Sequence, residues 1–445
     1  MRRAWVAAVL FVLARPAIGT VVTNDYDGVR VIVNYDRDRI APYALEDPLT
    51  FADGRPVKSA ADWRQRRAEI LGIFAREMFG AEPPKPETLV ADLVKERVTC
   101  DGAAIRRQYA MYFRADRSGP CVNWFVWVPK SAKGPAPVIS FLNYRGVHEY
   151  VSDADIPLPT AWIRNGEYIS GHRASEKTRG LFLDQNSATI FPLQMILARG
   201  YAVMTACYCE VSPDPEWDEP APYEQRQFAY TGVFGLWGRR DEGRTDNVTA
   251  IGAWAWALSR GLDLAERIPE LDARRSLVMG CSRLGKAALL AAARDERFAV
   301  CVPNQCGGGG VCLAKRNFGE SVKSEVTLFS HWYCRAYEKY AEDPARLLTF
   351  DQHLLLASIA PRPVLVQGMT DSDWMDTESE FLACRAAAPV WAFLGYGTMP
   401  AVAYPDDYST AAVGDRLGYV RRPGQHGISG QDWTWALDFA DRVLK

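Results

Sequence analysis

The most informative segment for the fold is Ser276-Leu-Val-Met-Gly-Cys-Ser-Arg-Leu-Gly-Lys286. Its apolar run stops at Gly280, and Ala- and Leu-rich helical sequence begins near Gly285. A strand that turns this sharply into a helix, with a serine at the apex, is typical of a nucleophile elbow. Such a turn would place the Ser282 hydroxyl beside the helix N-terminus, where backbone N–H groups can stabilise a developing oxyanion.

The spacing of this stretch departs from the usual elbow pattern, G-x-S-x-G. Leu284 stands two residues past the serine, and the second glycine follows one position later, at Gly285. An alternative interpretation therefore stays open, in which Ser282 simply caps the helix.

The overall composition is that of an ordinary globular protein. The chain has 445 residues, of which 48% are hydrophobic, and its formal net charge is −2. This length allows two domains or one α/β domain with insertions. Because the charge is balanced and no long basic block occurs, the sequence does not indicate nucleic-acid binding. Ten cysteines permit disulfides but do not reveal any pairing.

The N-terminus has the features of a secretory signal peptide. Two arginines follow Met1, and a mostly apolar run extends over residues 4–14, with small residues at 17 and 19. We predict a signal peptide over residues 1–19, cleaved near Gly19, and hence a secreted or periplasmic protein. The apolar run is too short to span a bilayer, and no later segment predicts a membrane span.

Alternating strand and helix signals predict an α/β fold with a mainly parallel sheet covered by helices on both faces. Residues 20–60 read as irregular. A helix capped by Asp62 follows over 62–79, with Ile70, Phe74 and Met78 on one face. Antiparallel edge strands come next, at 108–113 and 123–128. The later elements are strands at 138–142, 201–206, 277–279, 298–302, 363–367 and 418–421, helices at 192–199, 248–266, 285–293 and 431–444, and a polar, Pro-rich insertion around 210–244.

Three strand ends carry the residue types of a hydrolytic triad. Ser282 follows the first, Asp371 the second, and His426 lies in a Pro-Gly loop before the last helix. The order Ser, Asp, His is that of the α/β-hydrolases. A serine hydroxyl needs a base to take its proton, and the imidazole needs a carboxylate to fix its tautomer and stabilise its cation.

The remaining histidines do not suggest a second chemistry. We expect structural roles for His148, His172, His331 and His353, the last as a hydrogen-bonded residue at a helix start. No HExxH motif or His/Cys cluster occurs, so we predict no metal and no cofactor.

The segment from Gly280 to Lys286 resembles the G-C-S-R-x-G-K signature of the glucuronoyl esterases, carbohydrate esterase family 15, of the bacterial type. The resemblance covers essentially the whole mature chain and implies one α/β-hydrolase domain over residues 20–445, with an N-terminal extension and an insertion around 210–244. Further matching segments are Asn34-Tyr35, Pro42-Tyr43, Leu142-Asn-Tyr-Arg-Gly146, Ile156-Pro-Leu-Pro159, Gly171-His-Arg-Ala-Ser-Glu176, Arg316-Asn-Phe-Gly-Glu320, His331-Trp332, Asp351-Gln-His353 and Arg422-Pro-Gly-Gln-His426.

The resemblance implies an activity and three catalytic roles. The substrates would be esters between the glucuronic acid of xylan, often 4-O-methylated, and lignin alcohols. Ser282 would be the nucleophile and His426 the base. Arg283 would supply its backbone N–H, and its guanidinium, to the oxyanion. We expect a monomer without a membrane span.

The resemblance also implies that Lys286, Glu320 and Trp374 contact the glucuronate. The residues alone favour other roles. Lys286 could be a solvated surface lysine, Glu320 an ion-pair partner of Arg316, and Trp374 a core aromatic residue.

The triad acid departs from the family pattern. Many members place a glutamate at the end of the strand after the nucleophile helix, where this chain has Gln305. An amide can hydrogen-bond a histidine but cannot stabilise its cation. We therefore assign the acid to Asp371, with Asp373 as the alternative. Gly427 is a second departure, since an acidic residue is common after the histidine.

Two other functions stay open at this stage. One is an esterase for another carbohydrate ester, such as acetylated xylan. The other is a catalytically impaired carbohydrate-binding homologue, which Gln305 suggests.

Overall fold

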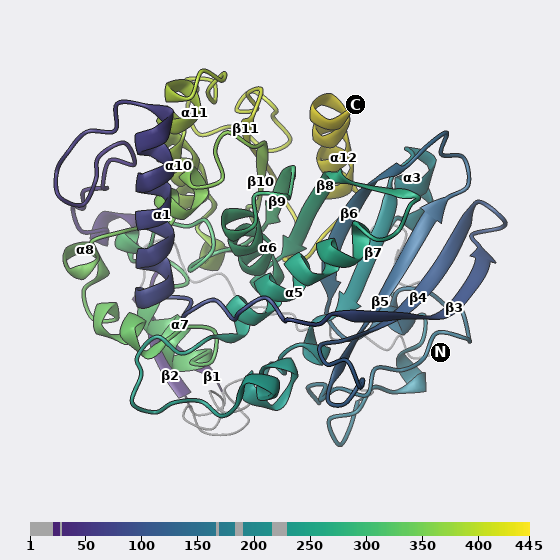
Figure 1. Cartoon of the computed structure of the whole chain (residues 1–445). Coiled ribbons are helices and arrows are strands. Elements are labelled where there is room, and N and C mark those ends of the chain that lie inside the picture. The colour runs from purple at the N-terminus through teal and green to yellow at the C-terminus, as the bar shows by residue number, and fades with distance from the viewer. Residues whose placement is uncertain (1–20, 27–28, 166–168, 183–189, 216–228) are drawn as a thin grey trace, which may run out of the picture.

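The computed structural model describes residues 21–26, 29–165, 169–182, 190–215 and 229–445 (Figure 1). The predicted signal peptide lies outside these residues. Within them, the structure contains no helix of the length and apolarity that a membrane crossing requires.

A nine-stranded sheet forms the centre of the molecule, in the order β11-β10-β9-β8-β6-β7-β5-β4-β3. The strands from β11 to β7 run parallel, and β5, β4 and β3 continue antiparallel. Their bounds are β3 Val90–Thr99, β4 Ala104–Tyr112, β5 Cys121–Pro129, β6 Ala136–Asn143, β7 Ala202–Cys207, β8 Leu271–Cys281, β9 Val300–Asn304, β10 Val364–Met369 and β11 Leu417–Arg422. The predicted parallel sheet with an antiparallel edge is confirmed.

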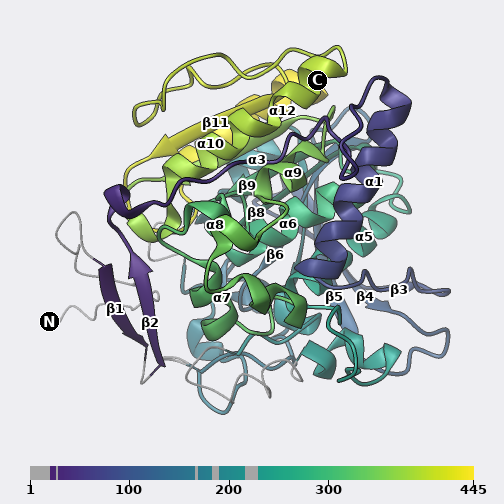
Figure 2. The ribbon, with the colours of Figure 1, turned by 90° about the vertical axis from the view of Figure 1, so that its left-hand side faces the viewer.

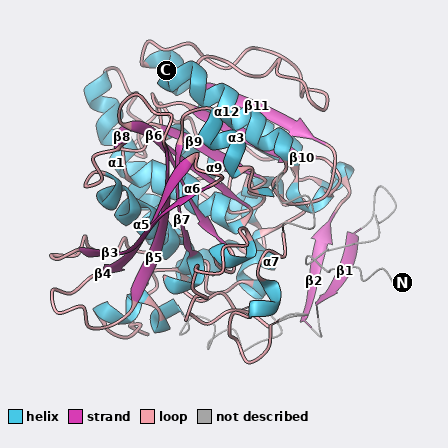
Figure 3. Cartoon of the chain, turned by 90° about the vertical axis from the view of Figure 1, so that its right-hand side faces the viewer, coloured by secondary structure: helices cyan, strands magenta, loops and turns pink. Residues whose placement is uncertain are grey.

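Helices cover both faces of this sheet, and each face has its own hydrophobic core (Figures 1 and 3). One core includes side chains of α1 (Ala60–Glu77), α5 (Ala250–Ala265), α6 (Arg283–Arg294), α7 (Val322–Leu328), α9 (Gln352–Ala357), α10 (Thr377–Ala387) and α11 (Pro389–Phe393). The other includes side chains of α3 (Leu193–Ala198) and α12 (Gly430–Leu444). The short α8 (Pro344–Leu347) lies between α7 and α9 in the chain. This architecture is the predicted α/β-hydrolase fold.

The prediction of an irregular segment at residues 20–60 is wrong at its beginning. β1 (Val21–Tyr26) and β2 (Val29–Asn34) pair antiparallel as a two-stranded sheet, apart from the main one and packed on α7 (Figure 2). Along β2, Val31 and Val33 are buried while Ile32 between them is 62% exposed. This alternation is a two-residue period typical of a strand with one covered face.

The predicted cap of the first helix is also wrong. The helix begins at Ala60, and the N-cap is Ser59, whose Oγ accepts a hydrogen bond from the Asp62 N–H (3.1 Å). Asp62 lies in the first turn, and its carboxylate accepts from the Lys58 N–H (3.0 Å). Serine and aspartate are both good caps, so the sequence offered two candidates three residues apart. The predicted inward face of this helix, including Ile70, is buried.

Candidate active site

The backbone at Ser282 has the strained geometry of a nucleophile elbow. Its φ of 58° and ψ of −131° lie in a region that non-glycine residues rarely adopt. The Ser282 N–H donates to the Asn304 carbonyl of β9 (2.9 Å), which fixes the turn against the sheet. Ser282 occupies the N-cap position of α6, but among the described residues its hydroxyl makes no capping hydrogen bond. The alternative of a serine that serves as a helix cap is therefore not supported.

Two glycines allow this turn to be tight. A Cβ on Gly280 would lie 2.1 Å from the Leu284 carbonyl oxygen, inside the first turn of α6. A Cβ on Gly285 would lie 2.6 Å from Cys306 Sγ, so this glycine lets α6 approach the end of β9. The shift of the second glycine by one position thus keeps its packing function, and Leu284 is buried instead.

Arg283 is the first residue of α6 and holds its guanidinium in a defined place. Nη1 donates to the carboxylate of Asp214. The guanidinium carbon lies 4.6 Å from the ring centroid of Trp332 and 5.6 Å from that of Phe329. These two rings are stacked on each other, with centroids 3.9 Å apart. An ion pair and an aromatic face therefore orient this arginine beside Ser282.

Asp214 is a site residue that the sequence analysis missed. It is buried, and besides Arg283 it accepts hydrogen bonds from His331 Nε2 (2.7 Å), Trp332 Nε1 (2.8 Å) and the Tyr208 hydroxyl (2.9 Å). Burial alone would raise the pKa of this carboxyl, but the Arg283 charge and the hydrogen bonds hold the pKa well below its ordinary value. Asp214 belongs to the segment predicted as a polar insertion, so this segment contacts the site.

Lys286 and Glu320 form a buried ion pair one helical turn from Ser282. Lys286 is only 2% exposed, and its Nζ donates to both carboxylate oxygens of Glu320, at 3.2 and 3.1 Å. The same Nζ lies 4.0 Å from Glu325 Oε1 and 5.0 Å from the Trp332 ring centroid. Burial raises the pKa of Glu320, and the adjacent Lys286 opposes this rise. The alternative of a solvated surface lysine is wrong.

Trp374 lies next to this pair in space. Its carbonyl accepts the Glu320 N–H (2.9 Å), and its partly buried ring packs against the core. Arg316 pairs with Asp376 (2.9 Å) and Glu378 (2.8 Å), so it is not the partner of Glu320. The structure therefore brings together the three residues for which the resemblance implied sugar contacts.

His426 lies in the loop between β11 and α12, and its side chain is exposed. Although solvent reaches the ring, the surrounding protein and the cations of Arg283, Lys286 and Arg422 lower the pKa of His426 to about 4. The imidazole is therefore neutral at neutral pH, as a general base must be.

Asp371 and Asp373 follow β10, which pairs with the strand that leads to His426. Both side chains are exposed. Within the described residues, no hydrogen bond joins either carboxylate to the His426 ring. The two candidate acids thus lie after β10, without a formed hydrogen bond to the base in the described part of the chain.

Gln305 comes directly after β9 and is fully buried. Its Nε2 donates to the Gly427 carbonyl (3.0 Å), and its Oε1 accepts the Gly427 N–H (2.8 Å). Both polar atoms of the amide are thus bonded to the residue that follows His426.

No metal site is evident in the part of the chain that the structure describes, which contains no group of three or more His, Cys, Asp or Glu side chains able to hold an ion. All ten cysteines belong to the described residues, and each is a free thiol. The predicted structural role of His353 is confirmed, because this buried residue at the start of α9 is hydrogen-bonded through Nε2 to the Glu46 carbonyl (2.7 Å).

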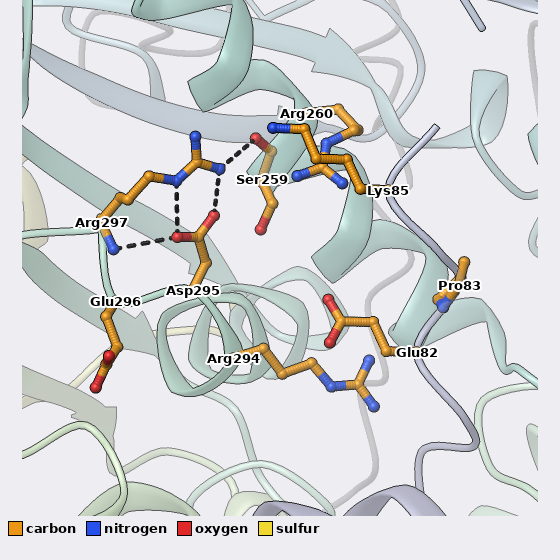
Figure 4. A pocket seen from close by; sticks show the side chains of 9 residues that line it. All are labelled: Glu82, Pro83, Lys85, Ser259, Arg260, Arg294, Asp295, Glu296 and Arg297. Carbon is orange, nitrogen blue, oxygen red and sulfur yellow. Dashed lines mark hydrogen bonds and ion pairs between the residues drawn. The ribbon is translucent and has the colours of Figure 1, made fainter. Parts of the chain in front are cut away.

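A charged surface pocket of about 700 Å³ lies at the far end of α6 from Ser282 (Figure 4). Among the described residues, three of the four cations that line it are in ion pairs, with Lys85 3.4 Å from Asp263. Arg297 binds Asp295 (2.6 Å), Asp263 (2.7 Å) and Glu266 (3.1 Å), and Arg260 binds Asp263 (2.8 Å). This pocket is an ion-pair network between α5 and the end of α6, separate from the serine.

The fold and the serine at the strand–helix turn place the chain in the class of α/β-hydrolases. The model of the family described as glucuronyl esterase, fungi, matches residues 235–395. Over 418 residues, which are 92% of each chain, the sequence is 34% identical to carbohydrate esterase MZ0003 of an unknown prokaryotic organism. It is 27% identical to a 4-O-methyl-glucuronoyl methylesterase of Schizophyllum commune, covering 79% of this chain and 74% of that protein.

Solved structures agree with these sequence matches. A promiscuous CE15 esterase from a marine bacterial metagenome superposes with a TM-score of 0.83 at 33% identity, covering 92% of this chain and all of the other. The glucuronoyl esterase of Solibacter usitatus gives 0.82 at 32% with the same coverage. The chain belongs to carbohydrate esterase family 15, the glucuronoyl esterases, and is a carboxylic ester hydrolase.

Proposed function

We propose that this chain is a secreted serine esterase that cleaves esters between (4-O-methyl-)glucuronic acid of xylan and lignin alcohols. The observation that carries the proposal is the buried Lys286–Glu320 pair beside the strained Ser282. A fixed cation and carboxylate can bond the hydroxyls of a sugar acid, whereas a simple acyl ester needs neither. The names of the relatives support this substrate, and the N-terminal sequence supports export.

In the first step, Ser282 Oγ attacks the ester carbonyl while the neutral His426 takes its proton. The carbonyl oxygen becomes an oxyanion beside the N-terminus of α6 and the Arg283 guanidinium, which Asp214 and Trp332 hold in place. Collapse of this intermediate breaks the ester C–O bond, and the protonated His426 gives its proton to the leaving alcohol.

In the second step, water loses a proton to His426 and attacks the acyl-enzyme. The bond to Ser282 Oγ breaks, the proton returns to the serine, and glucuronic acid leaves. Asp371 is the proposed acid that stabilises the His426 cation in both steps, with Asp373 as the alternative. The pairing of β10 with β11 supports an acid after β10, since Asp371 and His426 then follow adjacent parallel strands.

The test compares hydrolysis of benzyl glucuronate by the wild type and by Ser282→Ala, Asp371→Asn and Asp373→Asn. We expect no activity in the serine variant, and a loss of about 10⁴ in turnover for the variant that removes the true acid. Full activity in Ser282→Ala would refute the mechanism. A wild type that is inactive on the ester would indicate a catalytically impaired homologue.

A second substrate class is favoured by one relative, which is described as a promiscuous esterase. Acetylated xylan and aryl acetates therefore belong in the same assay. Activity on acetyl esters without activity on methyl glucuronate would replace the proposed substrate and keep the serine mechanism.

A further inference from the structure

The loop that carries His426 is held at one residue from two directions. Gln305 bonds both the N–H and the carbonyl of Gly427. Arg422 Nη2 donates to the same carbonyl, and Arg422 Nη1 donates to the Pro423 carbonyl (3.1 Å). His426 lies between these two anchored residues, so its position depends on the bonds on either side of it.

The anchors themselves are rigid. Gln305 has a left-handed φ of 47°, and its N–H donates to the Gln367 carbonyl of β10 (2.7 Å). The Arg422 guanidinium is fixed by the buried carboxylate of Asp432 (2.8 Å). Bonds to β10 and to Asp432 therefore hold Gln305 and Arg422 in place before any substrate is present.

We propose that Gln305 is a positioning residue for His426, and that its amide is required because it donates to one Gly427 atom and accepts from the other. This proposal rests on the proposed function, in which His426 is the base. The role that it assigns to Gln305 differs from that of a triad acid, because the amide bonds the loop backbone.

The proposal predicts that the substitution Gln305→Glu lowers the activity. An ionised glutamate at position 305 can accept the Gly427 N–H, but its second oxygen would face the Gly427 carbonyl at hydrogen-bond distance, with no donor between them. It would also draw the Arg422 guanidinium away from that carbonyl. If Gln305 were instead a lost triad acid, Gln305→Glu would restore the missing carboxylate and raise activity.

Protonation of the new side chain gives a second signature. A neutral carboxylic acid has one O–H donor and one carbonyl acceptor, which is the pattern of the amide it replaces. Burial favours this neutral form. The deficit of Gln305→Glu should therefore shrink as the pH falls from about 8 to about 5, a range in which His426 remains neutral.

The experiment measures the rate at which a fluorophosphonate labels Ser282, together with kcat and KM on benzyl glucuronate, across this pH range. The variants are Gln305→Glu and Gln305→Met, which keeps the size without the hydrogen bonds. The matched control is Gln367→Glu. Gln367 is equally buried, and its side chain bonds Asn304 and the Asp432 carbonyl (2.8 Å each).

We expect both Gln305 variants to lose about 10²-fold in labelling rate and kcat near pH 8, with KM little changed, because a displaced base costs about this much. Only Gln305→Glu should recover at lower pH. The Gln367→Glu control should lose thermal stability, but its labelling rate per folded molecule should not show the pH-dependent deficit, because this side chain does not bond Gly427.

Wild-type rates in Gln305→Met at every pH would overturn the proposal. Faster labelling by Gln305→Glu, with a gain that grows with pH, would also overturn it and restore the lost-acid interpretation. If the wild type labels at Ser282 but does not cleave the glucuronate ester, the proposed substrate fails, and the labelling profile still decides the role of Gln305.

Discussion

Asp214 offers the sharpest test of how the site holds its cationic donor. Its Oδ1 accepts from His331 and Trp332, and its Oδ2 accepts from Tyr208 and Arg283. Trp332 and Arg283 can only donate, whereas the tyrosine hydroxyl and the imidazole can each reverse their roles. An asparagine at position 214 must turn its NH₂ group toward either Trp332 or Arg283 in each of its two amide orientations, and both of these groups can only donate.

The two orientations of Asp214→Asn differ in cost. Turning the NH₂ group toward the Trp332 indole costs about 1–3 kcal/mol, and turning it toward the Arg283 guanidinium costs more because that group carries a charge. We therefore expect the amide oxygen to face Arg283 in this variant, with a loss of stability of about 1–3 kcal/mol and a modest loss of rate. Asp214→Ala removes the acceptor altogether, and kcat should fall by about 10²–10³, the value of one oxyanion donor.

The assay is steady-state hydrolysis of benzyl glucuronate, with thermal unfolding of each variant measured in parallel. Asp263→Ala is the matched control, because Asp263 is equally buried and pairs with Arg260 and Arg297 at the far end of α5. Both alanine variants should lose about 3–5 kcal/mol of stability, since each removes the carboxylate that pairs with a largely buried cation, Arg283 in one case and Arg260 in the other. Only Asp214→Ala should lose turnover per folded molecule. Unchanged kcat in folded Asp214→Ala would refute the idea that this carboxylate positions Arg283.

Three further predictions concern the base, the sugar site and the elbow. Because the base must be neutral, and the surrounding protein and nearby cations lower the pKa of His426 to about 4, kcat/KM should stay constant on acidification and halve only near pH 4, whereas a midpoint at or above the ordinary 6.5 would contradict this lowering. Lys286→Met should lower kcat/KM for glucuronate esters by about 10–150-fold, which corresponds to the loss of one charged hydrogen bond. The same variant should change kcat/KM for aryl acetates much less. Equal losses on both substrates would contradict a sugar-binding role. Gly280→Ala should abolish activity because its Cβ would overlap the Leu284 carbonyl, while Gly134→Ala, which has open space, should behave as the wild type in activity and melting temperature.

The fold could be predicted because its signals are local. Buried strands read as short apolar runs, helices read as periodic faces, and the turn at Ser282 is marked by Gly280 and Gly285 within a few residues. Gly285 lies one position later than the second glycine of the G-x-S-x-G motif. The structure shows why it is tolerated, since what matters is the close approach of α6 to the end of β9 rather than one fixed spacing.

The missed site residues depend on contacts between distant segments. Asp214 lies in a Pro-rich stretch with no periodicity, and nothing in that stretch points to a partner at Arg283. The sequence shows Gln305 where an acid is expected, but the bonds of Gln305 to Gly427 join residues 122 positions apart. A polar side chain that binds a remote backbone group leaves no trace in a single sequence. The N-cap of α1 shows the same limit at short range, where two good caps compete.

The central claim is that Ser282 is the nucleophile of a glucuronoyl esterase, and mass spectrometry after labelling tests it most directly. The wild type is treated with a fluorophosphonate while hydrolysis of benzyl glucuronate is followed in the same samples. We predict one label per chain, on the peptide that contains Ser282, and a loss of activity in proportion to labelling. A label on another residue, or full hydrolysis by enzyme labelled at Ser282, would contradict the claim.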